Sequence, residues 1–405
     1  MSISLADSIS GVAYKRLKAV EIDPATSHQH EFNGVEPLKQ IMGDNPNPTT
    51  FPARFVYLEN SDDENISIDS EVTWYDARRD HPTRSEFRLY FKKNDALGAA
   101  RVGDSIFFCR VKNSEQLIII ITPESSTSEQ QLSFLFDAGH ISEQAHFTGK
   151  EFNSRILGPI ERIILDQLEI EPEETDGSLK NAVIGEYGNM WPTGREFSAF
   201  VRSWLSHVEP RDDPDDALIM WWDTETRMFK VLEQYNLEHT ISEGFKSVDD
   251  FFTTAKSAMN RRYSRAGLAL EHHIEEVLNQ HSLKFERNGR TEHKKQPDFL
   301  FPGSEYYNSG DFPSSGLTIL GVKTSCKDRW RQVLSEGSKV PHKHLLTLEP
   351  SISENQTDEM KNSLLQLVVP SSIHKTYTEN QRNWLFSVSD FIAHVREKQV
   401  SHRAK

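Results

Sequence analysis

The sequence predicts two domains, an N-terminal domain built mainly of β-strands and a C-terminal α/β domain with a central mixed sheet flanked by helices. First, a chain of 405 residues is longer than one typical hydrophobic core supports. Second, short runs of β-branched and aromatic residues, separated by Asn, Asp, Gly and Ser, fill most of residues 1–170. Third, helical periodicity begins after residue 190 and later alternates with apolar strand-like runs.

The N-terminal domain is expected to cover residues 1–170. Its clearest strands are residues 51–59, 86–91, 104–112 and 115–123, and residues 161–170 have the pattern of a short closing helix. The segment 171–190 opens with acidic residues, Pro, Gly and Ser, which offer little to bury. We therefore expect a linker at residues 171–190.

The C-terminal domain is expected over residues 191–405, beginning with helices at 196–208, 217–235 and 247–262. The clearest helix is 264–283, with Ser264 as a candidate N-cap. Strands are predicted at 298–301, 317–324, 344–350 and 364–370, with a helix at 329–339. Four residues would form the apolar stripe of the 264–283 helix: Leu270, Ile274, Val277 and Leu278.

The composition is that of a globular protein without a membrane span. Hydrophobic residues make up 36% and charged residues 26%, and no apolar run approaches the roughly 20 residues that cross a bilayer. The N-terminus lacks the basic region and apolar core of a signal peptide. Cys109 and Cys326 form neither a disulfide framework nor a metal-binding spacing. We therefore expect a reducing, cytoplasmic location.

The net charge of −15 would disfavour a nucleic-acid partner if the charge were evenly spread. However, residues 78–93 carry six Lys or Arg against two acids, and residues 323–343 again carry six against two. The acids gather at 169–176 and at 208–217, where we expect a solvated loop. Because DNA responds to the face that it touches, this distribution is compatible with DNA binding.

Three residues are candidates for a phosphodiester-cleaving site: Asp298, Lys323 and Glu336. Asp298 and Lys323 lie in two apolar strands, and Glu336 follows Lys323 by thirteen residues on an expected helix. Two carboxylates can hold Mg²⁺, which prefers oxygen ligands. A lysine can orient or help deprotonate the attacking water and stabilise the transition state at the phosphate. The acid usually found two places before such a lysine is absent, because Gly321 occupies that position. On spacing alone, a solvated turn remains the alternative.

Residues 247–374 resemble the EcoRII-type restriction endonucleases of the PD-(D/E)xK nuclease superfamily. The matching stretches are SVDDF, NRRYSRAGLALE, PDFLFP, GVKTSCKDRWRQ and LVVPSSIHK, in this order. The resemblance implies a bacterial, Mg²⁺-dependent, site-specific deoxyribonuclease of a restriction–modification system. It also implies that the missing acid has moved to the following helix as Glu336, that Glu271 is an additional acid, and that Tyr307 belongs to the catalytic site.

The resemblance further implies that Lys327, Asp328 and Arg329 read consecutive G·C pairs in a target with CC and GG halves. Basic side chains donate to guanine and an acid accepts from cytosine, so the chemistry is suitable. The alternative for this triplet is a charged first turn of a helix. Arg331 would contact a phosphate or brace the helix.

The N-terminal domain loosely resembles the DNA-binding pseudobarrel effector domain of the same family, through YKRL, SHQ and TRSEFR at residues 14–17, 27–29 and 83–88. A solvated, charged hairpin is the alternative. The candidate DNA contacts are His28, Arg79, Arg84, Glu86, Arg88 and Lys92.

The implied partner is double-stranded DNA, bound by a homodimer because a palindromic target matches a two-fold axis. A cognate DNA methyltransferase would act on the same site without needing to bind the protein. By analogy with the family, the N-terminal domain would act as an allosteric effector or autoinhibitor. Two alternatives are a nuclease that reads methylated DNA through the N-terminal domain and a DNA-binding regulator that does not cleave.

Other features have simpler explanations. The histidines at 28, 30, 272 and 273 lack Cys or His partners at ligand spacing, so we expect no transition-metal site. The aromatic pairs Trp221–Trp222 and Phe251–Phe252 lie in helical patterns and are expected in a core or an interface.

Overall fold

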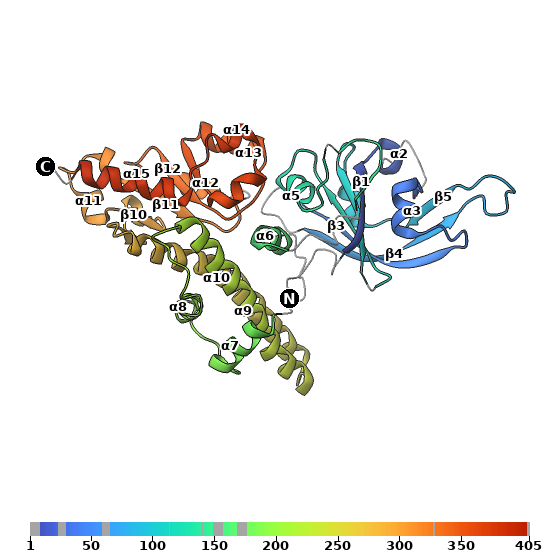
Figure 1. Cartoon of the computed structure of the whole chain (residues 1–405), viewed down its shortest axis with the longest axis horizontal. Coiled ribbons are helices and arrows are strands. Elements are labelled where there is room, and N and C mark those ends of the chain that lie inside the picture. The colour runs from blue at the N-terminus through green and yellow to red at the C-terminus, as the bar shows by residue number, and fades with distance from the viewer. Residues whose placement is uncertain are drawn as a thin grey trace. The chain divides into compact units, whose positions relative to one another are not determined.

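The computed structural model describes residues 9–22, 30–58, 65–112, 114–139, 141–148, 157–167, 176–326 and 329–402. The chain divides into two compact units, one taking in Ser2–Glu173 and the other most of the chain from Glu174 onward (Figure 1). No helix in the described ranges combines the length and hydropathy needed to cross a bilayer.

The N-terminal unit is built mainly of β-strands, as the sequence predicts. The four predicted strands are present as β3, β5, β6 and β7, and the predicted closing helix is α6. The strands are β1 (Ile9–Arg16), β2 (Glu31–Asn33), β3 (Thr49–Tyr57), β4 (Ile66–Asp76), β5 (Phe87–Phe91), β6 (Ser105–Val111), β7 (Leu117–Thr122) and β8 (His146–Thr148). The helices are α2 (Ala19–Ile22), α3 (Glu36–Met42), α4 (Asp95–Ala99), α5 (Thr127–Leu135) and α6 (Pro159–Gln167).

These strands form one curled, mixed sheet in the order β2-β5-β4-β3-β7-β6-β1-β8. Neighbouring strands are antiparallel except β3 and β7, which are parallel. Within the described ranges β2 and β8 end the sheet and do not pair with each other. The pseudobarrel form of this unit therefore stays a prediction.

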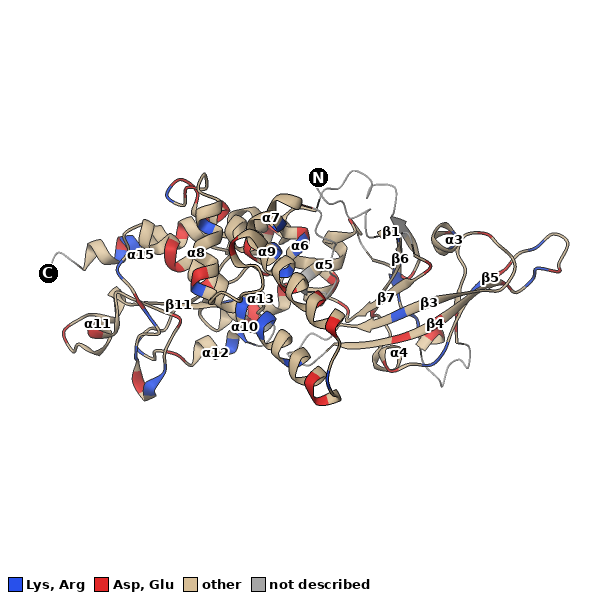
Figure 2. Ribbon diagram, turned by 90° about the horizontal axis from the view of Figure 1, so that it is seen from below, with Lys and Arg blue, Asp and Glu red and all other residues tan. Residues whose placement is uncertain are grey.

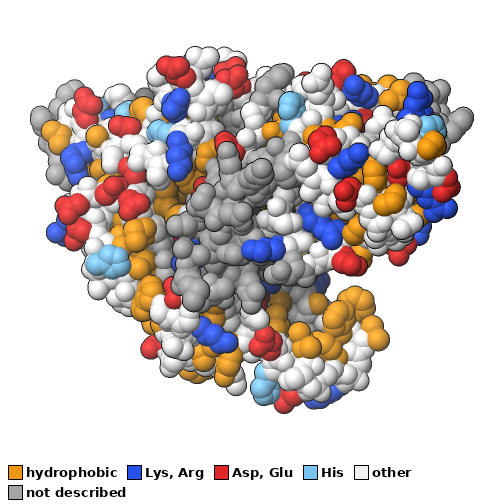
Figure 3. Space-filling view, turned by 45° about the vertical axis from the view of Figure 1, so that its right-hand side comes forward, with side chains coloured by type: hydrophobic (Ala, Val, Ile, Leu, Met, Phe, Trp, Pro, Cys, Tyr) orange, Lys and Arg blue, Asp and Glu red, His pale blue; other side chains and the backbone are white. Residues whose placement is uncertain are grey.

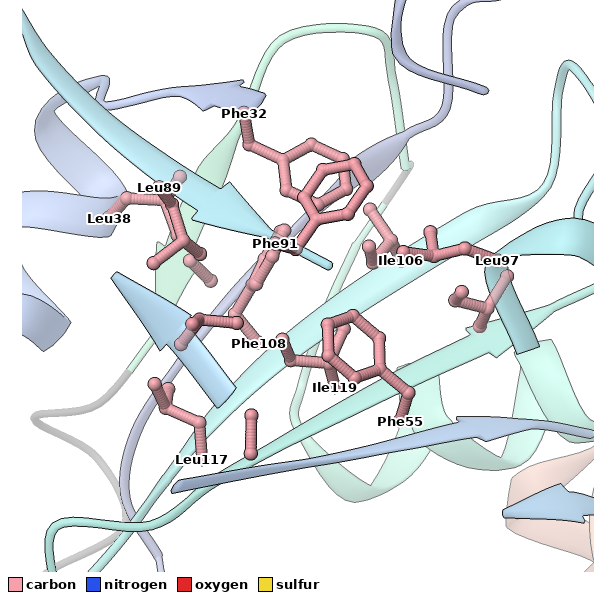
Figure 4. Close-up of a cluster of buried hydrophobic side chains, with 14 of the residues drawn as sticks. Phe32, Leu38, Phe55, Leu89, Phe91, Leu97, Ile106, Phe108, Leu117 and Ile119 are labelled. Carbon is pink, nitrogen blue, oxygen red and sulfur yellow. The ribbon is translucent and has the colours of Figure 1, made fainter. Parts of the chain in front are cut away.

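The core of the N-terminal unit follows from the period-two pattern of its strands. The buried residues of β3 are Phe51, Ala53, Phe55 and Tyr57. Arg54, on the other face, forms an ion pair with Asp69 of the neighbouring strand β4 at 2.8 Å. Aromatic rings from several strands meet in this core, and the Phe32 and Phe91 ring centroids lie 4.7 Å apart (Figure 4).

The C-terminal unit begins with helices and ends with alternating strands and helices. The long helices α9 and α10 pack against each other, and α7 and α8 also pack against α9 (Figure 1). The α-helices are α7 (Gly177–Tyr187), α8 (Gly194–Trp204), α9 (Pro214–Glu243), α10 (Val248–Gln280), α11 (Ser304–Asn308), α12 (Trp330–Leu334), α13 (Glu354–Asn362), α14 (Glu379–Arg382) and α15 (Val388–Ser401). The 3₁₀ helices are η2 (Glu292–Lys294), η3 (Ser314–Gly316) and η4 (Ser371–Thr376).

The mixed sheet of the C-terminal unit has the order β13-β12-β11-β10-β9. The pairs β9–β10 and β10–β11 are antiparallel, whereas β11–β12 and β12–β13 are parallel. Helix α10 contacts β11, α12 contacts β12, and α13 contacts β13. This agrees with the predicted α/β layer. The strands are β9 (Glu286–Arg287), β10 (Phe299–Phe301), β11 (Thr318–Val322), β12 (Lys343–Leu346) and β13 (Leu365–Val368).

Two details differ from the expected elements. The helices expected at 247–262 and 264–283 are one continuous helix, α10, which is capped by the Ser247 hydroxyl rather than by Ser264. Ser264 lies inside the helix, where its hydroxyl donates to the Arg261 carbonyl at 3.4 Å. The expected linker at 171–190 contains α7, because Leu179 and Val183 supply two buried side chains to that helix.

Candidate active site

Asp298 and Lys323 form the centre of the candidate site at the edge where β10 begins and β11 ends. Asp298 Oδ2 accepts a hydrogen bond from the Val322 backbone N–H at 2.7 Å and one from Lys323 Nζ at 3.1 Å. Both side chains are largely buried, with 17% of Asp298 and 23% of Lys323 exposed. The register places Phe299 opposite Leu320, so the antiparallel pairing itself sets Asp298 beside the end of β11.

The glycine at position 321 is explained by packing. A Cβ atom built on Gly321 would lie 2.5 Å from Cγ2 of Val333, a buried residue of α12. All five residues of β11 are buried, so neither face of this strand is open to solvent. Helix α12 therefore occupies the space that an acid at position 321 would need.

Glu336 lies just after α12, in the turn that follows the helix and not within it. Its backbone N–H donates to the Val333 carbonyl at 3.1 Å, and Gly337 continues the turn with a left-handed φ of 56°. Burial raises the pKa of Glu336 to about 7, and the negative charge of Asp298 adds to the shift. Glu336 Oε2 is buried and has no hydrogen-bond partner among the described residues.

Glu271 lies on α10 near the same carboxylates and is held by Arg287 of β9. The Arg287 guanidinium donates to Glu271 Oε2, and to Glu275 Oε2 at 2.8 Å. Burial raises the pKa of Glu271, the charge of Asp298 raises it further, and Arg287 opposes the shift. Since Asp298 perturbs both Glu271 and Glu336, three carboxylates and Lys323 share one region.

Tyr307, which the resemblance assigns to the catalytic site, makes its hydrogen bonds with the neighbouring loops. It is buried on α11, and its hydroxyl donates to Glu292 Oε2 and accepts from the Lys339 backbone N–H at 3.2 Å. Burial raises the pKa of Tyr307, and its hydrogen bond to Glu292 adds to the shift. Among the described residues, the hydrogen bonds of this hydroxyl are thus with the loops beside the site and not with Asp298, Lys323 or Glu336.

The carboxylates fit a hard divalent cation. A buried, unpartnered carboxylate oxygen on Glu336 beside the carboxylate of Asp298 is the donor chemistry that Mg²⁺ prefers, and their mutual repulsion is what a cation would relieve. In the part of the chain that the structure describes, no group of three or more His, Cys, Asp and Glu side chains is placed to hold a metal ion. Two protein carboxylates with water and a substrate phosphate would suffice for Mg²⁺.

The residues expected to read bases lie next to this site in the sequence. Lys327 and Asp328 are outside the described residues. Arg329 is exposed just before α12, and its backbone N–H donates to the Cys326 carbonyl at 2.7 Å. Arg331 pairs with Glu359 of α13 at 2.6 Å and lies over the Trp330 ring, so in this structure it braces the helix.

The expected DNA contacts of the N-terminal unit are divided between an exposed loop and internal ion pairs. Arg79 and Arg84 are exposed on the loop between β4 and β5. Arg88 is half-buried between Glu31, at 2.6 Å, and Glu86. Lys92 pairs with Glu71 at 3.0 Å, and His28 lies outside the described residues.

The segment 208–217 corrects one expectation, because it is not simply a solvated loop. Asp213 caps α9, and Asp215 is buried on the first turn. Asp215 Oδ1 accepts from the Ser371 and Val388 backbone N–H groups at 3.0 and 2.8 Å. Its Oδ2 accepts from the backbone N–H and hydroxyl of Ser389 at 3.0 and 2.8 Å. The pattern Asp213–Pro214 was the available signal, since Asp at the N-cap followed by Pro marks a helix start.

The histidine and aromatic pairs lie in different environments. His272 and His273 are buried beside Ser198 and Glu225, with N···O distances of 3.2 and 3.0 Å. Trp221 and Trp222 are core residues, as expected. Phe251 and Phe252 are exposed at the start of α10, so they are not core. Figure 3 shows that hydrophobic side chains gather in several places on one face of the molecule.

Part of the C-terminal unit is similar to proteins of a known family. A family model described as EcoRII C terminal matches residues 229–392. The type II restriction enzyme EcoRII of Escherichia coli is 42% identical over 206 residues, which are 51% of this chain and 50% of that enzyme. The match thus spans about half the length of that relative. Residues 229–392 are therefore similar to the C-terminal domain of the EcoRII-type restriction endonucleases.

Similar solved structures include two restriction endonucleases bound to DNA. Metal-depleted Ecl18kI in complex with uncleaved, modified DNA has a TM-score of 0.44 and 17% identity, covering 57% of this chain and 86% of that chain. The PspGI–substrate DNA complex has a TM-score of 0.44 and 16% identity, covering 52% of this chain and 94% of that chain.

Proposed function

We propose that the protein is a type II restriction endonuclease that makes Mg²⁺-dependent double-strand breaks in DNA at a short specific site. The observation that carries this proposal is the Asp298–Lys323 pair beside the buried, unpartnered carboxylate of Glu336. It is supported by the family match of the segment that contains all three residues.

The residues would divide the work of phosphodiester hydrolysis. Asp298 and Glu336 would hold Mg²⁺, which, when bound, lowers the pKa of a coordinated water and neutralises charge at the phosphate. Lys323, fixed by Asp298 at 3.1 Å, would orient the attacking water and stabilise negative charge on the phosphate oxygens. Glu271 would support the site from α10 while Arg287 holds its carboxylate.

Specificity would come from the segment that precedes α12. Lys327 and Arg329 would donate to guanine, and Asp328 would accept from cytosine, so the target would contain CC and GG halves. The N-terminal unit would bind DNA as an allosteric effector or autoinhibitor, through exposed basic residues such as Arg79 and Arg84. A homodimer on double-stranded DNA would cut both strands of a palindromic target.

Plasmid digestion tests the proposal. The full-length protein with Mg²⁺ should convert a sequenced phage or plasmid DNA to discrete fragments whose mapped ends share one site. Lys323→Ala should retain DNA binding in a mobility-shift assay but lose cleavage by a factor of at least about 10², as expected for loss of an electrostatic catalytic group. DNA binding without cleavage by the wild-type protein, on methylated and unmethylated DNA alike, would favour a non-cleaving regulator instead.

A further inference from the structure

Two loops beside the candidate site, residues 290–295 and 337–342, present exposed basic side chains and are here called the basic loops. The first carries Arg290, His293 and Lys294, and the second carries Lys339 and His342. The described residues offer no carboxylate partner to Arg290 or Lys294. Figure 2 shows charged residues of both signs on the ribbon around α11 and α12, the helices next to these loops.

The two basic loops are joined through a group of hydrogen-bonded residues, here called the Glu292 cluster, which consists of Glu292, Tyr307 and Ser338. Glu292 accepts from the Tyr307 hydroxyl through Oε2 and from the Ser338 backbone N–H, at 2.5 Å, through Oε1. The Tyr307 hydroxyl also accepts from the Lys339 backbone N–H at 3.2 Å. Although burial alone would raise the pKa of Glu292, these hydrogen bonds lower it to about 2.

The first basic loop has an unusual backbone. His293 and Lys294 are consecutive non-glycine residues in the left-handed region, with φ of 56° and 61°. Left-handed backbone is strained for a residue with a side chain, and it persists only where the surrounding structure determines it. Here Thr291 closes the loop, since its backbone N–H and hydroxyl donate to the Lys295 carbonyl at 2.9 and 3.1 Å. The result is that the side chains at the tip of the loop are held at the surface.

The basic loops are also tied to the residues proposed to cut DNA. Lys295 Nζ donates to the Ser335 carbonyl at 2.6 Å, and Ser335 directly precedes Glu336. Lys339 Nζ donates to the Tyr307 carbonyl at 2.7 Å. Asp298 follows the first basic loop by three residues. The first basic loop is therefore hydrogen-bonded to the residue that precedes Glu336, and it lies three residues before Asp298 in the sequence.

We propose that the basic loops bind the DNA sugar–phosphate backbone beside the scissile phosphate, and that Tyr307 is a positioning residue that holds them together through Glu292. This rests on the proposed function, since the ligand is the DNA that the site would cut. Phosphate contacts carry no base information, so the basic loops contribute affinity and register equally on every sequence.

Binding as a function of salt tests the phosphate contacts. The measurement is the Kd of the full-length protein for a fluorescent random-sequence duplex at salt concentrations between 50 and 200 mM. EDTA is present throughout, so that Mg²⁺-dependent cleavage cannot occur. The double variant Arg290→Gln/Lys294→Gln should bind about tenfold more weakly, and the slope of log Kd against log salt should fall by about 1.8, or 0.9 for each lost contact. A charge-matched control, Lys180→Gln/Lys246→Gln, removes exposed lysines from α7 and the α9–α10 turn and should retain the wild-type slope.

Tyr307→Phe tests the positioning role, because it keeps every charge and the buried ring but removes the hydroxyl that Glu292 and Lys339 share. In this variant Kd and KM should both rise several-fold, and the slope of log Kd against log salt should be lower than in wild type. A fall confined to the single-turnover rate at saturating DNA, with wild-type Kd, would make Tyr307 a catalytic residue and overturn the positioning role.

The outcomes separate this inference from the proposed function. If the wild-type protein cleaves DNA but the Arg290/Lys294 variant has the slope of the control, the basic loops do not bind phosphate and only this inference fails. If the wild-type protein binds DNA with the predicted slopes but never cleaves, the proposed function fails while the phosphate contacts stand.

Discussion

At the scale of single residues, the carboxylate of Glu336 is the group whose burial has the most directly measurable effect on the stability of the fold. A carboxylate with an unpartnered buried oxygen is unfavourable when ionised, because burial removes the water that would stabilise its charge. Such a cost at one position is typical of functional sites, where a ligand compensates for it. The same residue therefore links the stability of the metal-free protein to its capacity to bind a cation.

Glu336→Gln should stabilise the metal-free protein at high pH. The pKa of Glu336 is raised to about 7 in the folded state, so ionisation destabilises the fold progressively as pH rises from about 4.5 through 7 and fully above it. In EDTA at pH 8 the variant should melt about 2–4 °C higher than wild type, which corresponds to roughly 1 kcal/mol, and at pH 5 the difference should largely vanish. Thermal scans at both pH values measure this.

Glu305→Gln supplies the control for the Glu336 prediction, because Glu305 is an exposed carboxylate on α11. Its melting temperature should differ from wild type by the same small amount at pH 5 and pH 8. An equal shift of the Glu336 variant at the two pH values would show that the ionised carboxylate does not destabilise the fold.

Arg287 is the residue near the site that spacing alone could not indicate. It opposes the raised pKa of Glu271, so Arg287→Met should raise that pKa further and extend the pH range in which Glu271 is protonated. If cleavage requires the carboxylate, the acid limb of the pH–rate profile should move to higher pH, and Arg287→Lys should move it less. Arg195→Met is the matched control, because Arg195 pairs with Glu275 at 3.0 Å and not with Glu271. If the acid limb is unchanged in Arg287→Met, the ionisation of Glu271 does not control the rate of cleavage.

At the scale of elements, the first turn of α9 is joined to the C-terminal part of its own unit by Asp215. The carboxylate accepts four hydrogen bonds from the segments that begin η4 and α15. Asp215→Asn places an amide donor either against the Ser389 N–H or against the Ser371 and Val388 N–H groups, so at least one backbone donor loses its acceptor. We expect a loss of about 1–3 kcal/mol in the free energy of unfolding, measured by urea denaturation.

Asp212→Asn tests whether the Asp215 effect is specific. Asp212 is exposed in the same acidic segment, so its free energy of unfolding should stay within about 0.5 kcal/mol of wild type. If the two variants lose the same stability, net charge in the segment matters more than the four hydrogen bonds.

The elements also show where sequence reasoning succeeds and where it stops. Strands such as β7, with a run of β-branched residues, and the buried stripe of Leu270, Ile274, Val277 and Leu278 are local patterns, and the structure contains both. The continuity of α10 past Ser264 was not predictable, because a serine that can cap a helix can also lie inside one. The packing of α12 onto Gly321 and the Arg287 contacts depend on residues far apart in the sequence.

The candidate site shows the same limit. Asp298, Lys323 and Glu336 could be proposed from residue types and the resemblance, and the strand register explains why the first two meet. The Glu292 cluster joins positions 292, 307 and 338, which no local pattern relates. Side-chain contacts of this kind follow from the tertiary fold and not from spacing.

At the scale of the whole molecule, the division into two compact units makes the effector role of the N-terminal unit testable by truncation. The end point matters, because α7 begins at Gly177 and packs against α9. A deletion of residues 1–185 would remove most of this helix and expose its buried Leu179 and Val183. A deletion of residues 1–173 follows the boundary between the units and leaves α7 complete.

Deletion of residues 1–173 should therefore raise the rate of cleavage of DNA that carries a single target site, if the N-terminal unit inhibits the C-terminal unit until it binds DNA itself. The measurement is the initial rate on single-site and two-site plasmids, with wild type and the truncated protein compared at equal concentration. Inhibition predicts that wild type is faster on two-site than on single-site DNA and that truncation abolishes this difference. A folded truncated protein, shown by a cooperative melting transition, that is no faster on single-site DNA would rule out autoinhibition and leave targeting as the role of the N-terminal unit.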